Sequence, residues 1–235
     1  MSASARLVAV RSDAVRPDGR PGTPAPARPS NGPVVVLLHG FGSHEHDLAG
    51  LGPHLDAPWV SLRAPLALPH GGFAWFPIVT PGDPDPEPVA HATDAVWAWI
   101  DAELGADVAV TPVGFSQGGL MATQLLRTRP ARVAATVVLG GFVQAAEQPA
   151  DADLASARPP VFWGRGADDR VIAARAVERT AAWLPGHATP TERVYPGLGH
   201  GIDARELADV RAFLQTVGVA DPVPPPGLEP GTRRV

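Results

Sequence analysis

The fold is decided by residues 108–119, VAVTPVGFSQGG, in the middle of the chain. The apolar run Val108–Val113 predicts a buried strand, and the pattern of Gln117–Thr128 predicts a helix. Between them, Gly114-Phe115-Ser116-Gln117-Gly118 matches G-x-S-x-G, which is typical of a serine raised on a sharp strand-to-helix turn. Glycines two positions before and after the serine leave room for backbone that must pass close by. Ser116 is therefore the predicted nucleophile.

Further apolar runs and helical patterns alternate on both sides of this stretch, and each alternation predicts a parallel crossover unit. We expect an α/β protein with a mostly parallel central sheet and helices on both faces. Such sheets place their sites at the carboxyl ends of the strands. The expected strands are Ala5–Arg11, Val34–Leu38, Trp59–Leu62, Val108–Val113, Ala134–Leu139, Pro160–Trp163 and Arg193–Tyr195, and the expected helices are Val89–Leu104, Gln117–Thr128, Ile172–Leu184 and Asp203–Val217. Pro112 cannot donate to a sheet ladder, so we expect pairing to end near it or the strand to be irregular there.

The strand Val34–Leu38 leads into His39-Gly40-Phe41-Gly42. In enzymes with such a serine turn, one oxyanion donor comes from the loop after an early strand and the other from the residue after the nucleophile. The backbone N–H groups of Phe41 and Gln117 are the predicted pair. His39 is interpreted as a packing residue of this loop, not as an acid or base.

A histidine and two aspartates complete the pattern. His200 lies in the Gly/Pro-rich segment 195–201, YPGLGHG, between a short strand and the last helix, where a general base could reach the serine. Asp168 and Asp169 follow the strand Pro160–Trp163 and a Gly-rich turn. The residues themselves leave open which aspartate faces the histidine, and the order Ser, Asp, His fits either one.

Composition excludes several other classes. The formal net charge of −5 offers no basic face for nucleic acid or anionic lipid, so neither partner is expected. The chain has no cysteine and no apolar run long enough to cross a bilayer. Met1–Val10 lacks a basic region followed by a long apolar segment, so we expect no secretory leader, no membrane insertion and a cytoplasmic location. His44 and His46 could suggest a metal, but residues two apart share no helix face, and a solvated helix start is the preferred interpretation. No metal site is predicted.

The sequence divides into three parts by composition. Residues 1–33 hold one expected strand and the Pro/Gly-rich loop Arg16–Pro33, residues 34–217 form the α/β domain, and residues 218–235 form a flexible Pro-rich tail. The oligomeric state cannot be predicted from these features.

Four motifs together resemble the phospholipase/carboxylesterase family of α/β-hydrolases, which includes acyl-protein thioesterases. They are LLHGFGS at 37–43, GFSQGG at 114–119, GADDRVI at 166–172 and YPGLGHGI at 195–202. The resemblance spans residues 34–217 and departs from the family at Pro112 and at Ala173, where a proline is common. It implies the α/β-hydrolase fold without a large lid domain, hydrolysis of small-molecule carboxylic esters or thioesters, and no cofactor.

The resemblance also assigns roles to particular residues. The family's turn, Gly-x-x-Asp-x followed by an apolar pair, matches Gly166 to Ile172, selects Asp169 as the partner of His200 and leaves Asp168 as a turn residue. The segment GGFAWF at 71–76 is similar to the family's aromatic loop, so Trp75 and Phe76 are candidate substrate-binding residues, with Phe142 either beside them or in the core. Three functions stay open: an esterase, a thioesterase or acyltransferase with the same triad, and a catalytically inactive ligand-binding module.

Overall fold

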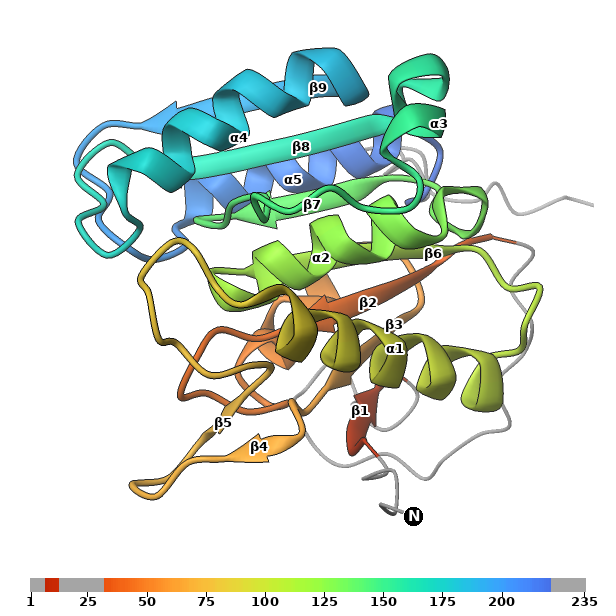
Figure 1. Cartoon of the computed structure of the whole chain (residues 1–235). Helices are drawn as coiled ribbons and strands as arrows, with labels where there is room; N and C mark the ends of the chain where they lie inside the picture. Colours follow the sequence, from red (N-terminus) through yellow and green to blue (C-terminus); the bar gives the residue numbers. More distant parts are fainter. Residues whose placement is uncertain (1–6, 13–31, 221–235) are drawn as a thin grey trace, which may run out of the picture.

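The computed structural model describes residues 7–12 and 32–220, and these form one central sheet with helices packed on its two faces (Figure 1). The seven strands run in the spatial order β1-β3-β2-β6-β7-β8-β9. Only β1 pairs antiparallel, with β3; the other pairs are parallel. The strands are β1 Ala9–Arg11, β2 Val34–Leu38, β3 Trp59–Leu62, β6 Val110–Phe115, β7 Thr136–Leu139, β8 Pro160–Gly166 and β9 Thr189–Tyr195. This is the predicted mostly parallel α/β-hydrolase architecture.

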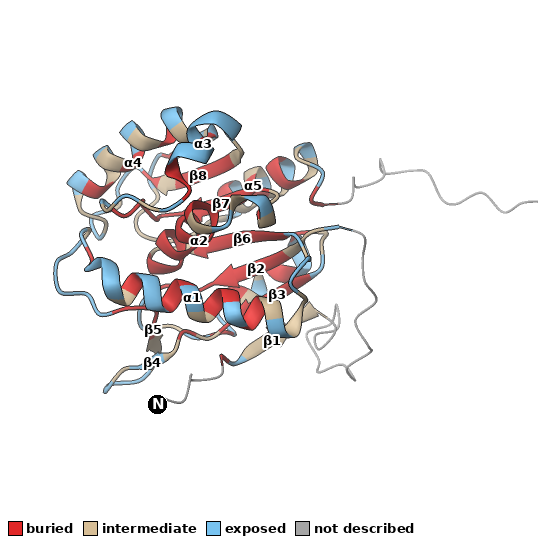
Figure 2. Ribbon diagram, turned by 45° about the vertical axis from the view of Figure 1, so that its right-hand side comes forward, coloured by how far each residue is buried: buried red, intermediate tan, exposed pale blue. Residues whose placement is uncertain are grey.

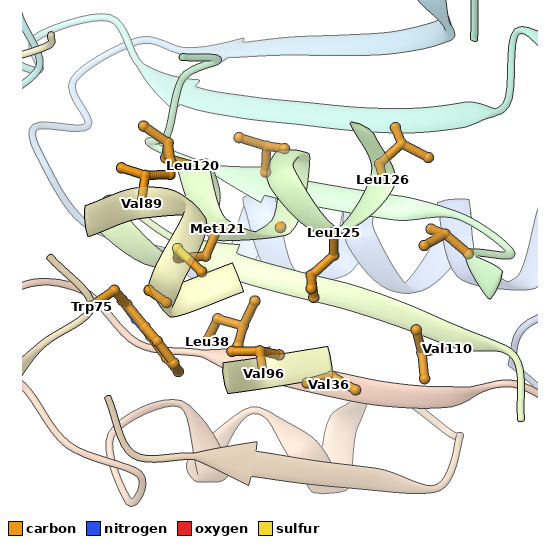
Figure 3. Close-up of a cluster of buried hydrophobic side chains, with 14 of the residues drawn as sticks. Val36, Leu38, Trp75, Val89, Val96, Val110, Leu120, Met121, Leu125 and Leu126 are labelled. Carbon is orange, nitrogen blue, oxygen red and sulfur yellow. The ribbon is translucent and has the colours of Figure 1, made fainter. Parts of the chain in front are cut away.

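Two hydrophobic cores lie on opposite faces of the sheet, and Figure 2 shows the central strands buried between them. Helices α1, α2, α3 and α4 cover one face, where side chains of α1 and α2 pack over β2 and β6 (Figure 3). Helix α5 covers the other face with Val210, Phe213 and Leu214. The helices are α1 Pro86–Glu103, α2 Gln117–Thr128, α3 Asp151–Ala157, α4 Ala174–His187 and α5 Ala204–Thr216, with short 3-10 helices at Leu48–Gly50, Gly52–His54 and Pro130–Arg132.

A small hairpin stands apart from the main sheet. Its strands are β4, Leu66–Ala67, and β5, Phe73–Ala74. Two backbone hydrogen bonds join it to the loop after β2, from Gly42 N–H to Phe73 O at 2.9 Å and from Phe73 N–H to Ser43 O at 2.8 Å. The hairpin therefore holds the loop that carries the predicted oxyanion donor. No lid domain is present among the described residues.

Of the two outcomes expected at Pro112, an end of strand pairing is wrong, because β6 continues through it to Phe115. A local irregularity is present on the β7 side, where the ladder is interrupted between the bridge Val110–Val133 and the pair Val113–Val137. Pro112 is in register with Val36 of β2. On the other side, pairing with β7 begins only at Val113. The Val110 carbonyl accepts from Ala134 N–H on that side, and alternate residues of a strand face the same neighbour, so the Pro112 nitrogen also faces β7. The N–H group that Pro112 lacks would thus point toward β7 at a position where the β6–β7 ladder has no pair.

Residues on both sides of the predicted domain 34–217 also take part in the packed structure. Part of the N-terminal segment belongs to the sheet, since Ala9–Arg11 pairs with β3. At the other end, Val219 and Ala220 are buried in the core under α5, so the packed chain extends past the predicted boundary at 217. Most of the predicted loop 16–33 and all of the tail 221–235 lie outside the described residues. Within the described part, no helix combines the length and apolarity needed to cross a membrane.

Candidate active site

Ser116 stands on a strained turn between β6 and α2. Its backbone has φ 55° and ψ −115°, a conformation that costs a non-glycine residue free energy. A side-chain carbon on Gly114 would overlap the Gly118 carbonyl, and one on Gly118 would overlap the Leu38 carbonyl. The two motif glycines are therefore required by the close approach of the backbone on either side of the serine. The turn is held by a hydrogen bond of 2.8 Å from Ser116 N–H to Leu139 O of β7.

The structure brings Ser116, His200 and Asp169 together in one hydrogen-bonded chain. His200 Nε2 lies 2.9 Å from Ser116 Oγ, and His200 Nδ1 lies 2.7 Å from Asp169 Oδ2. The three residues follow β6, β9 and β8, whose carboxyl ends meet at the same edge of the parallel sheet (Figure 1). The imidazole also packs against the Phe115 ring, with 4.8 Å between the ring centroids. This geometry allows a proton to pass from the serine to the histidine.

The two adjacent aspartates have different surroundings. Asp169 directs Oδ2 at His200, while its Oδ1 accepts from Val171 N–H at 2.8 Å and from Ile172 N–H at 3.2 Å. Asp168 is exposed, and its backbone N–H donates to Leu198 O at 2.9 Å. The geometry thus places Asp169, the aspartate selected by the family turn, beside the histidine.

The two candidate oxyanion donors belong to two different segments, the start of α2 and the loop after β2, and both segments lie beside the serine. Gln117 is the first residue of α2, and the first N–H groups of a helix have no partner within it. Phe41 follows Gly40, at which a Cβ atom would lie 3.5 Å from Ser116 Cβ, so the loop after β2 runs beside the serine. The Phe41 side chain is 46 % exposed.

Buried hydrogen bonds fix the loops around these donors. His39 is fully buried; its Nδ1 lies 2.7 Å from Gly40 O and its Nε2 accepts from Ala64 N–H at 3.0 Å. Burial lowers the pKa of His39, which keeps it neutral in this role. The Gln117 side chain accepts from Trp75 N–H at 2.8 Å and donates to Phe76 O at 2.7 Å. His39 therefore braces the loop, as its predicted packing role requires.

An apolar cavity of about 250 Å³ opens beside the nucleophile. Two of the candidate substrate residues, Phe76 and Phe142, line it together with Ser116 and Gln117. Trp75 does not line it; this side chain is 1 % exposed and donates its indole N–H to His39 O at 2.9 Å. The remaining lining residues are Ile78, Thr80, Pro81, Gly82, Pro84, Val171 and Ile172.

The histidines considered as metal ligands do not form a site. The side chains of His44 and His46 are exposed, and no group of three metal-binding side chains gathers among the described residues. Glu45 between them is 1 % exposed and forms an ion pair with Arg63, whose hydrogen bond lowers the pKa of this carboxyl. The segment is thus anchored by Glu45 and is not a fully solvated helix start.

Comparison with known proteins identifies the family of the chain. The family model for phospholipase/carboxylesterase matches residues 24–218. The chain belongs to this family. Its relatives include a probable carboxylesterase of Oryza sativa subsp. japonica, 26 % identical over 216 residues that cover 83 % of this chain and 81 % of the relative. Another is acyl-protein thioesterase 1 of Cryptococcus neoformans, 25 % identical over 215 residues, with coverage of 77 % and 90 %.

Solved structures support the same fold. A carboxylesterase of Bacillus cereus superposes with a TM-score of 0.71 at 21 % identity, covering 90 % of this chain and 93 % of that one. The phospholipase/carboxylesterase family thus accounts for the whole α/β domain, and this member is a carboxylesterase-type hydrolase. One rice relative, 29 % identical over 216 residues, carries the name probable inactive carboxylesterase.

Sequence reasoning did not identify most of the cavity wall. Residues 77–85, PIVTPGDPD, supply Ile78, Thr80, Pro81, Gly82 and Pro84, yet the segment has no periodicity and no motif. Its only visible signal is its proline content, which indicates a loop. The helix expected over Ile172–Leu184 begins later, at Ala174, so Val171 and Ile172 precede α4 and line the cavity.

Proposed function

We propose that this protein hydrolyses carboxylic esters of small to medium acyl chains through an acyl-enzyme on Ser116. The single observation that supports the proposal best is the hydrogen-bonded chain from Ser116 Oγ through His200 to Asp169. A binding module would not need a strained serine aligned with a histidine and a carboxylate. We also propose that the substrate is a small-molecule ester and that the protein is located in the cytoplasm.

In the first half of the reaction, His200 Nε2 accepts the Ser116 hydroxyl proton while Oγ bonds to the ester carbonyl carbon. Asp169 accepts the Nδ1–H of the histidine, which fixes its tautomer and stabilises the imidazolium. The tetrahedral intermediate then collapses, the carbon–oxygen bond to the alcohol breaks, and His200 returns the proton to the departing alkoxide. Water repeats the sequence on the acyl-enzyme and releases the carboxylic acid.

The negative charge on the tetrahedral intermediate needs donors that are already in place. The N–H groups of Gln117 and Phe41 are proposed for this role, supported by the N-terminus of α2, where the helix dipole is positive. Loss of one such donor typically costs about 3–4 kcal/mol of transition-state stabilisation. The Gln117 side chain is hydrogen-bonded to the backbone of Trp75 and Phe76, and these bonds hold the first residue of α2 against the segment that follows β5.

The cavity sets the proposed acyl size. A cavity of about 150 Å³ can hold benzene, so the 250 Å³ here corresponds to about ten carbon atoms on the same scale. Its lining is almost entirely apolar, apart from Ser116, Gln117 and Thr80. It therefore suits a short or medium acyl chain. A thioester would meet the same triad and the same cavity, so thioesterase activity is the second candidate, and the thioesterase among the relatives favours testing it.

The test compares the wild type with Ser116→Ala on p-nitrophenyl butyrate and on butyryl thioesters. We expect Ser116→Ala to fold normally and to lose about 10³-fold or more of kcat with both substrates. If the wild type hydrolyses neither substrate, the result favours the inactive binding module. Retention of activity by Ser116→Ala would refute the assignment of the nucleophile.

A further inference from the structure

Residues 77–85, hereafter the wall loop, form much of the cavity beside Ser116 and have little structure of their own. Residues 77–83 are exposed or half-buried. Among the loop residues that line the cavity, only Pro84 is buried. Prolines at 77, 81 and 84 carry no N–H. Within the loop, the structure describes one backbone hydrogen bond, from Asp83 N–H to Thr80 O at 3.0 Å. Something other than its own backbone must therefore hold the loop in place.

Side chains from outside the loop accomplish this by donating to its carbonyl oxygens. Arg175 Nη2 donates to Pro81 O at 2.8 Å, and Arg179 Nη2 donates to Gly82 O at 2.6 Å; both arginines are on α4. Gln144 Nε2 donates to Pro84 O at 3.3 Å from the segment after β7. Carbonyls of the wall loop are thus held by side chains that are distant in the sequence, sixty residues away for the glutamine and over ninety for the arginines.

Arg179 contacts two walls of the cavity at once. Besides its bond to Gly82 O, its Nε donates to Val143 O at 2.8 Å, and its guanidinium carbon lies 5.9 Å from the centroid of the Phe142 ring. Phe142 and Gly82 both line the cavity. Burial lowers the pKa of Arg179 from its very high ordinary value, and the facing charges are Asp83 on the loop with Arg175 and Arg127 on helices. The planar fork of arginine suits two carbonyls in different directions, whereas lysine is a single flexible point donor.

We propose that Arg179 is a positioning residue that sets acyl-chain selectivity by fixing the wall loop against Phe142. The inference rests on the proposed ester hydrolysis and on the acyl chain occupying this cavity. An acetyl group reaches little beyond the reacting carbonyl, so it gains little from the far wall. A hexanoyl chain gains from each methylene that the wall contacts, and one methylene in a well-formed apolar pocket changes kcat/KM by roughly 10–200-fold. Release of the loop should therefore lower kcat/KM more for esters of long acyl chains than for acetate esters.

The experiment measures kcat and KM for p-nitrophenyl acetate and p-nitrophenyl hexanoate with the wild type, Arg179→Gln and Arg179→Lys. We expect the hexanoate-to-acetate ratio of kcat/KM to fall about tenfold in Arg179→Gln, mainly through a higher KM for hexanoate, because less of the acyl chain is contacted. Arg179→Lys should recover part of the ratio. The ratio is independent of the amount of folded enzyme, because both substrates are cleaved by the same molecules. A merely structural role would leave it unchanged.

Arg158→Gln is the matched control. Arg158 also donates to a carbonyl at the end of α4, Pro185 O at 2.6 Å, but it lies outside the residues that line the cavity. We expect it to keep the wild-type ratio. If Arg179→Gln does not fold, Arg175→Gln removes the exposed bond to Pro81 O and should lower the ratio in the same direction.

Several results would overturn the proposal. An equal fall with both esters, or an unchanged ratio in variants that fold, would show that the arginines do not set selectivity. Hydrolysis of neither ester by the wild type would overturn the proposed function itself, and the inference with it.

Discussion

Replacing Asp169 by asparagine should disable the site without unfolding it, for a reason visible in its contacts. Asp169 Oδ1 accepts from two backbone N–H groups, those of Val171 and Ile172, while Oδ2 faces His200 Nδ1. An asparagine side chain has one acceptor oxygen and one donor NH₂ group. Because two backbone donors aim at the Oδ1 position, the amide oxygen must stay there. The NH₂ group then faces the histidine.

That arrangement forces the wrong tautomer on His200. With a donor opposite, Nδ1 must accept, so the ring proton moves to Nε2, the atom that lies 2.9 Å from Ser116 Oγ. The base then has no free lone pair for the serine proton. The same substitution in a serine protease triad lowers kcat about 10⁴-fold. We expect a fall of about 10³–10⁴-fold here, or about 4–5.5 kcal/mol of barrier at 1.36 kcal/mol per tenfold.

The assay is hydrolysis of p-nitrophenyl butyrate, with thermal unfolding recorded for each variant. Asp168→Asn is the matched control: its side chain is exposed and its backbone bond to Leu198 O survives the change, so kcat should move by less than about tenfold. The reasoning is refuted if Asp169→Asn stays within about tenfold of wild type while folded, or if Asp168→Asn is the crippled variant.

Two further predictions concern stability and metals. Burial, together with the charges of Asp203 and Asp209, raises the pKa of Glu206 to about 7, and neither carboxyl oxygen has a hydrogen-bond partner among the described residues. In the unfolded chain this proton is released near pH ~4.3, so between that pH and about 7 the unfolded state binds fewer protons and folding stability falls as pH rises. Relative to wild type, Glu206→Gln should therefore gain up to about 3 kcal/mol of unfolding free energy between pH 4 and 8 in urea titrations; identical pH dependence of the two proteins would contradict the assignment. EDTA should leave ester hydrolysis unchanged, whereas a loss restored by Zn²⁺ would redirect attention to His44 and His46.

The sequence was sufficient to predict the elements that are buried on one face or on both faces. The strand Val34–Leu38 and the helix Gln117–Thr128 have the predicted bounds, because a continuous apolar run and a clear helical period mark them. The strand predicted at Arg193–Tyr195 is longer, Thr189–Tyr195, since an exposed edge strand needs no apolar pattern. Helix α3, Asp151–Ala157, was not predicted, because seven residues are too few to show a period.

The candidate site divides in the same way. Ser116, Asp169, His200 and the oxyanion loop sit in Gly-rich motifs at strand ends, and their local geometry follows from those motifs. The wall loop and its arginines could not be inferred, because Arg175 and Arg179 donate to backbone carbonyls more than ninety residues away. A carbonyl acceptor has no side chain to mark it in the sequence, so only the fold reveals this contact.

Covalent labelling tests the central claim most directly. The wild-type chain would be incubated with a fluorophosphonate, its intact mass measured, and the modified peptide mapped beside a Ser116→Ala control. The account predicts one phosphonyl group per chain, located on Ser116, loss of ester hydrolysis in step with labelling, and no label on Ser116→Ala. Hydrolysis that persists in the fully labelled protein, or a label on another residue that accounts for the lost activity, would contradict it.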